Sequence, residues 1–108
     1  MSLEYKIIGQ DLVLDTEATI YTVPLAKQAT ITAIFIANYG DTECSYNLAI
    51  LPAGESISLK NYLRYGMLLA SKDFENISTK ITMSAGDSIV ISSSLADNLA
   101  ITIFGVEQ

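Results

Sequence analysis

The sequence predicts an all-β protein: an antiparallel, jelly-roll-like β-sandwich of about eight strands that forms a single domain over residues 1–108. Ile, Val and Thr account for 27 of the 108 residues, and β-branched side chains favour a pleated backbone. Apolar and polar residues alternate along several segments, which indicates strands with one buried face. Turn-forming residues recur roughly every 10–15 residues, a spacing typical of sandwiches and jelly rolls. A chain of this length forms one domain with one core.

Strand character is found in short segments along the whole chain, and no longer window has a helical period. The segments that we expect in strands are 4–9, 12–15, 18–23, 28–38, 44–51, 55–60, 62–69, 77–83, 87–95 and 99–106.

The segment 28–38 is unusual because apolar residues occupy both faces of an ideal strand. The odd positions carry Ile31, Ala33, Phe35 and Ala37, and the even positions carry Ile34 and Ile36. In a two-layer sandwich only one face of a strand reaches the core. The second face must therefore be covered by something else, either a contact with another subunit or a long loop.

The segments 44–51, 87–95 and 99–106 alternate more simply. In the first, the even positions are apolar and begin with Cys44, which the alternation directs inward. Each of the three segments is therefore expected to form an antiparallel strand with one face in the core.

Two turns share the pattern Ala-Gly-acid-Ser-Ile, at residues 53–57 and 85–89. Glycine adopts a positive φ without steric cost, and a carboxylate next to it can accept a local backbone N–H. We expect two similar turns, each leading into a strand.

Composition excludes several functions. With no His and one Cys, the chain lacks a Ser–His or Cys–His nucleophile pair, a zinc site built on these ligands and an internal disulfide. A net charge of −6 disfavours direct contact with nucleic acid or an anionic membrane. No apolar run approaches the roughly 20 residues that span a bilayer, and residues 1–10 lack a signal-peptide pattern. We expect a non-enzymatic protein, made in the cytoplasm, without metal or cofactor.

Acidic residues allow two further interpretations, neither supported by a motif. The carboxylates of Asp11, Asp15 and Glu17 are oxygen ligands of the kind that calcium prefers, but loop acids are usually just solvated. Asp73 and Glu75 form a pair of the kind that glycosidases use, but acidic β proteins commonly contain such pairs.

Tyr62 and Tyr65 flank Arg64 in the segment 62–69. Exposed Tyr and Arg side chains commonly anchor protein partners, so this segment is a candidate contact surface. The alternative is that the tyrosine rings are half-buried and only their hydroxyls meet water.

Two stretches form a family-like pattern. One is Ile20-Tyr21-Thr22-Val23-Pro24, followed by Lys27 and a strand that ends in Ile36-Ala37-Asn38. The other is residues 81–89, followed by serines at 92–94 and the ending Phe104-Gly105-Val106-Glu107. Together with Tyr62–Phe74, they resemble small virion structural proteins of tailed bacteriophages. Leu25-Ala26 stands where that family usually has Ala-Gly, and Ser71-Lys72-Asp73 replaces its usual Pro-Ala-Asn.

The resemblance implies a virion component on the capsid surface, in the neck or in the tail. It further implies a homo-oligomer, a trimer or a higher ring, that contacts other virion proteins. The residues that we expect at the contacts are Ile34, Phe35, Ile36, Tyr62, Arg64 and Tyr65.

An alternative is a carbohydrate- or host-surface-binding module, because sandwich scaffolds often carry binding loops. That hypothesis predicts exposed tyrosines in a concavity with Asp or Asn beside them.

Overall fold

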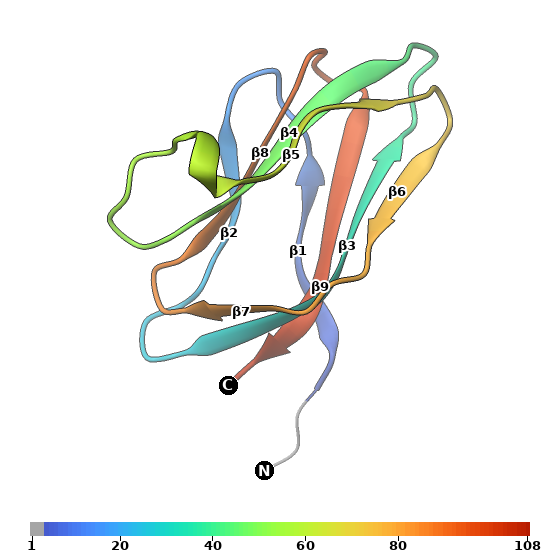
Figure 1. The fold of residues 1–108 in the computed structure, drawn as a ribbon. Helices are drawn as coiled ribbons and strands as arrows, with labels where there is room; N and C mark the ends of the chain where they lie inside the picture. The colour runs from blue at the N-terminus through green and yellow to red at the C-terminus, as the bar shows by residue number, and fades with distance from the viewer. Residues whose placement is uncertain (1–3) are drawn as a thin grey trace.

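The computed structural model describes residues 4–108 and shows a sandwich of two antiparallel sheets (Figure 1). Within these residues the chain forms nine strands and one turn of 3₁₀ helix. They are β1 (Lys6–Leu12), β2 (Ala18–Thr22), β3 (Gln28–Asn38), β4 (Cys44–Leu51), η1 (Leu59–Asn61), β5 (Tyr62–Leu69), β6 (Phe74–Ile77), β7 (Ile81–Ser84), β8 (Ser88–Ser93) and β9 (Leu99–Glu107).

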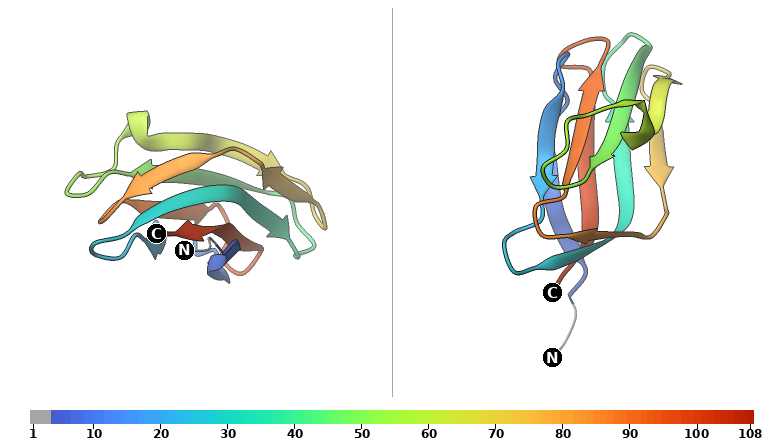
Figure 2. Two further views of the ribbon diagram at one scale, coloured as in Figure 1. Left: turned by 90° about the horizontal axis from the view of Figure 1, so that it is seen from below. Right: turned by 60° about the vertical axis from the view of Figure 1, so that its left-hand side comes forward.

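The strand order confirms the jelly-roll-like sandwich. The five-stranded sheet has the order β1-β9-β3-β6, with β7 pairing further along β3, and the four-stranded sheet has the order β2-β8-β4-β5. β6 and β7 lie along one edge of β3 and together replace a single long strand. With those two counted as one, the chain passes between two four-stranded layers as in a jelly roll (Figure 2).

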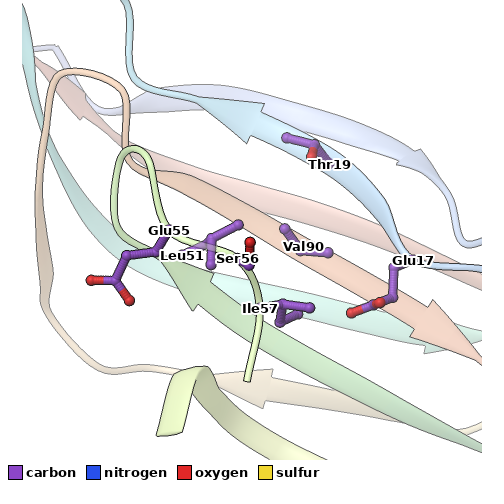
Figure 3. A pocket seen from close by; sticks show the side chains of 7 residues that line it. All are labelled: Glu17, Thr19, Leu51, Glu55, Ser56, Ile57 and Val90. Carbon is purple, nitrogen blue, oxygen red and sulfur yellow. The ribbon is translucent and has the colours of Figure 1, made fainter. Parts of the chain in front are cut away.

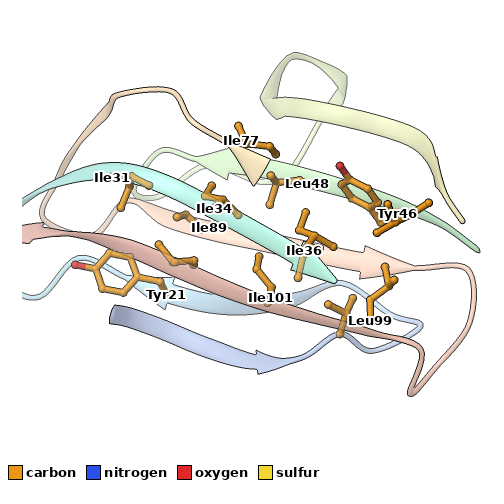
Figure 4. Close-up of a cluster of buried hydrophobic side chains, with 14 of the residues drawn as sticks. Tyr21, Ile31, Ile34, Ile36, Tyr46, Leu48, Ile77, Ile89, Leu99 and Ile101 are labelled. Carbon is orange, nitrogen blue, oxygen red and sulfur yellow. The ribbon is translucent and has the colours of Figure 1, made fainter. Parts of the chain in front are cut away.

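The core lies between the two layers and is built mainly from isoleucine (Figure 4). The five-stranded sheet contributes Ile31, Ile34 and Ile36 from β3 and Ile101 and Ile103 from β9, all without exposed surface. Burying such a side chain stabilises the fold by roughly 1.5–3 kcal/mol. Tyr46, Leu48, Ile89 and Ile91 close the core from the four-stranded sheet. Cys44 is buried there too, as its alternation predicted.

An extra residue in β3 changes which side chains face the core. The pairing of β3 with β9 is irregular between Ile31 and Ala33, so that Thr32 is inserted into the ladder. Ile31 therefore faces the core together with Ile34 and Ile36, whereas Phe35 faces outward. The prediction that placed Ile31 and Phe35 on one face is wrong because strict alternation does not anticipate a bulge.

Three strand boundaries also differ from the prediction. In place of separate strands at 4–9 and 12–15, one strand, β1, runs from Lys6 to Leu12 with an irregularity between Ile7 and Gly9, and residues 13–15 lie outside it. Residues 55–60 form a loop that ends in η1, and 77–83 is split between β6 and β7. The loop contains two turn bonds, from Glu55 N to Pro52 O and from Asn61 N to Ser58 O, so these backbone groups pair locally instead of in a sheet.

The two similar turns pack against each other. Gly54 and Gly86 have φ angles of 79° and 88°, as predicted. Asp87 accepts the Ser84 N–H at 2.9 Å and the Ala53 N–H of the other turn, also at 2.9 Å. The Asp87 carboxylate thus links the two turns through hydrogen bonds.

Several polar contacts join the sheets, one of them a buried hydrogen bond from Asn38 Nδ2 on β3 to Leu69 O on β5 at 3.0 Å. The Tyr21 hydroxyl on β2 donates to Glu107 Oε2 on β9 at 2.6 Å. Arg64 Nε on β5 donates to Glu75 Oε1 on β6 at 2.9 Å. Beside the Arg64–Glu75 pair, the buried Tyr46 hydroxyl has no hydrogen-bond partner among residues 4–108. Burial and the neighbouring Glu75 carboxylate raise the pKa of Tyr46.

We expect Ala26→Gly to stabilise the protein by about 1 kcal/mol, because Ala26 has a φ of 63° and an L-residue is strained in that region. Urea denaturation measures the change. The control Ala96→Gly lies in another turn, where φ is not positive, and should instead lower stability through the greater freedom of the unfolded chain. Two losses of similar size would contradict the prediction.

Tyr21→Phe and Tyr46→Phe should differ in their effect at neutral pH. The first removes a hydrogen bond to a carboxylate and should cost about 1.5–3 kcal/mol. The second removes a hydroxyl that has no partner in the described chain, so the free energy of unfolding should stay the same or rise. Equal losses in chemical denaturation would show that Tyr46 is hydrogen-bonded after all.

The contribution of Tyr46 to stability depends on pH. The folded protein raises the pKa of Tyr46 above its ordinary value of about 10. As pH rises, the unfolded chain loses its phenol proton first, so stability falls above about pH 10. The fall should be shallower in Tyr46→Phe than in the wild type when denaturation curves at neutral and alkaline pH are compared.

Candidate functional site

The six residues predicted at contacts occupy three different places. Ile34 and Ile36 lie in the core with no exposed surface, so the prediction that they contact a partner is wrong for this fold. Phe35 lies on the outward side of the five-stranded sheet. Tyr62, Arg64 and Tyr65 lie on β5, at an edge of the other sheet. The predicted residues therefore do not form one site.

The outward side of the five-stranded sheet is mostly apolar. Residues paired across antiparallel strands share a face, and Phe35 pairs with Thr102 and Asn76, while Ala37 pairs with Ala100 and Phe74. We use the name outer face for the residues that these pairings direct away from the core. They are Ile7, Gln10, Leu12, Ala33, Phe35, Ala37, Phe74, Asn76, Ala100, Thr102 and Phe104.

All three phenylalanines of the chain meet on the outer face. Phe35 stacks on Phe74 with ring centroids 6.0 Å apart, and Phe104 meets Phe35 edge-on at 5.8 Å. Both are favourable aromatic geometries. Phe35 on the central strand β3 thus joins rings from β6 and β9 into one cluster.

The described chain leaves the outer face exposed to solvent. Phe74 is 60% exposed, Ile7 53%, Leu12 48% and Phe35 38%. None of the outer-face residues is charged. Glu75, between Phe74 and Asn76, points the other way and binds Arg64. The outer face is therefore a neutral, apolar surface on a strongly acidic chain, and we treat it as the candidate site.

The opposite side of the sandwich is partly covered by the chain itself, although Leu68, which pairs with Ser45 on this side, is 66% exposed. Thr19, Val90, Ala49 and Tyr62 form one row across the outward side of the four-stranded sheet. Ala49 is fully buried there and Val90 is 7% exposed. The segment 52–58 lies over this side, between β4 and η1 (Figure 2). The sequence left two alternatives for the second face of the segment 28–38, a subunit contact or a long loop. A covering loop does occur, but on the four-stranded sheet and not over β3.

Tyr62 also covers the four-stranded sheet. Its hydroxyl donates to Glu17 Oε2 at 3.2 Å, and Glu17 precedes β2 on the far side of the sheet, so the ring is directed across β4. Burial, the Glu17 carboxylate and the neighbouring Tyr65 raise the pKa of Tyr62. Tyr65, whose ring meets Tyr62 edge-on at 4.9 Å, is the more accessible of the two, at 62% exposed.

Arg64 is engaged within the chain. Besides Glu75, its guanidinium donates to the Leu63 carbonyl at 3.1 Å. A partner that recruited this arginine would first have to break the contact that joins the edges of the two sheets.

A hollow of about 340 Å³ lies between the loop and the four-stranded sheet (Figure 3). Glu17 and Glu55 stand on opposite sides, and Glu55 pairs with Lys60 at 3.4 Å. The lining residues are Glu17, Thr19, Leu51, Glu55, Ser56, Ile57 and Val90. As far as residues 4–108 line it, the hollow contains no tyrosine, aspartate or asparagine, the features that a carbohydrate-binding site was expected to show.

Two further observations concern only residues 4–108. They contain no group of three or more potential metal-ligating side chains, and no helix among them has the length and apolarity needed to cross a membrane.

The sequence alone did not indicate that Phe74 and Phe104 lie next to Phe35. Their contact with Phe35 depends on which strands flank β3, and no local pattern encodes that neighbourhood.

No model of a known protein family matches the sequence, and no curated protein matches it either.

Tyr62→Ala should lower the free energy of unfolding by about 2 kcal/mol, because it uncovers Ala49 and Val90. Tyr65→Ala, the matched change at the more exposed ring, should cost about 1 kcal/mol or less, mainly the aromatic pair. Thermal and chemical denaturation of the two variants measure both losses of stability. A larger loss for Tyr65→Ala would mean that Tyr62 does not serve as a cover.

Proposed function

We propose that this chain is a non-enzymatic structural protein of a tailed-bacteriophage particle. It acts by assembling as a homo-oligomer, a trimer or a higher ring, on the capsid surface or in the neck or tail. The observation that carries the proposal is the outer face: a loop covers part of one side of the sandwich, whereas residues 4–108 leave the outer face apolar, uncharged and exposed. Surfaces of this composition are typical of the centres of subunit contacts.

The resemblance to small virion proteins is a second support. The stretches that carry it meet at one end of the sandwich, where Val23 N donates to Asp87 O and Gly86 N donates to Val23 O, both bonds within 3.0 Å. Gln28 and Gln108 also exchange two backbone hydrogen bonds there. These motifs therefore specify how the chain folds, and a function based on assembly would depend on the remaining surface.

The fold by itself does not choose between the candidate functions. Jelly rolls serve as capsid proteins and as lectins, and function depends on the site and not on the scaffold. The hollow under the loop is a concavity, but its lining offers no aromatic ring on which a sugar could stack. We therefore favour assembly over carbohydrate binding.

Multi-angle light scattering across a concentration series tests the proposal. We expect a mass that is a small whole multiple of the 11.7 kDa chain, with dissociation only on strong dilution. A monomer at every concentration would overturn the homo-oligomer. Immunogold labelling of purified phage particles tests the virion location separately, and unlabelled particles would contradict it.

A further inference from the structure

We infer that copies of this chain contact one another through the outer face, with the cluster of Phe35, Phe74 and Phe104 at the centre of the contact. The inference rests on the proposed function, since it names the surface by which the homo-oligomer forms.

The cluster is anchored on the central strand of the sheet. Phe35 on β3 and Phe104 on β9 belong to internal strands, and Phe74 belongs to the edge strand β6, so the rings extend from the middle of the sheet to its β6 edge. Binding energy concentrates in central aromatic clusters that are surrounded by weaker contacts. Ile7 and Leu12 on the edge strand β1 extend the apolar surface beyond the rings.

The side of the sandwich that carries the outer face has room for an interface. The sandwich measures 44 × 30 × 19 Å, and each of its broad sides belongs to one sheet. A standard stable interface buries about 800 Å² on each partner, which is less than such a side offers. A contact centred on the outer face and including the residues around it would therefore fit on this side.

The charge distribution favours a second copy as the occupant. Every copy has a net charge of −6, so two copies repel wherever carboxylates face each other. The outer face has no charged residue, and repulsion is therefore weakest there. A basic partner would be recognised through acidic groups, which this face does not provide, and an anionic lipid surface would be repelled by the chain as a whole.

The polar residues of the face are also compatible with self-contact. Gln10, Thr102 and Asn76 form one row with Phe35, and Gln10 Nε2 donates to Thr102 Oγ1 at 3.0 Å. Amides both donate and accept hydrogen bonds, so the same row on another copy can satisfy them. Where such a face lies on a symmetry axis, the residues at the axis meet their own equivalents.

The test is a charge placed on the face, with a matched charge elsewhere. Ala37→Glu and Phe74→Glu alter two exposed outer-face positions, and Leu68→Glu makes the same kind of change on β5, where Leu68 is 66% exposed. Light scattering should show the first two variants dissociating at about tenfold higher protein concentration or more, while Leu68→Glu behaves as the wild type. Circular dichroism verifies that each variant is folded.

A second measurement does not depend on tolerance of a buried charge. Cys44 is buried, so a cysteine introduced by Ala37→Cys is the accessible thiol of the described chain. Under mild oxidation Ala37→Cys should form a reducible cross-link between copies, and Leu68→Cys should not.

The outcomes separate the inference from the proposed function. If the wild type is a monomer at every concentration, the homo-oligomer fails and the inference fails with it. If the wild type is an oligomer that both glutamate variants leave intact and Ala37→Cys does not cross-link, the outer face is excluded and the proposed function stands. Dissociation by Leu68→Glu alone would overturn the inference and move the contact to β5.

Discussion

The extra residue at Thr32 is the constraint on which both surfaces of the five-stranded sheet depend. β3 is its central strand, and the bulge changes the phase of alternation half-way along it. Before the bulge the odd residue Ile31 faces the core, and after it the even residues Ile34 and Ile36 do. Without this change, either Ile31 or the later isoleucines would face solvent. The core and the phenylalanine cluster on the opposite side are therefore consequences of one inserted residue.

The sequence predicted the strands whose alternation and flanking turns are visible within the segment itself. The strands at 28–38, 44–51 and 62–69 match the observed bounds, because their alternation and flanking turns lie within the segment. The bulge at Thr32 was missed because its cause is the pairing with β9. The loop at 55–60 was mistaken for a strand because Ile57 and Leu59 mimic alternation, although Ile57 lines the hollow over the four-stranded sheet and Leu59 is exposed.

The candidate site was only partly accessible from the sequence. Phe35 was selected as a contact residue of a strand that was expected to be apolar on both faces, and the structure places it on the outer face. Ile34 and Ile36 were selected with it and proved to be core residues. Phe74 and Phe104 were not selected, since only the non-local pairings of Ala37 with Phe74 and of Ala33 with Phe104 bring them next to Phe35. Tyr62, in contrast, was selected as an exposed contact residue, and in the structure its ring covers Ala49 and Val90.

β5 has a consequence for the behaviour of the protein at high local concentration. An edge strand offers unpaired backbone groups to other chains and is the usual starting point of cross-β fibrils. β5 is such an edge, but its pairing with β4 is irregular twice, Gly66 has a φ of 64°, and Arg64 points inward to Glu75. Irregular backbone and an inward charge are the devices that block edge-to-edge stacking. The chain can therefore be crowded into a large assembly without its Leu- and Tyr-rich edge seeding amyloid.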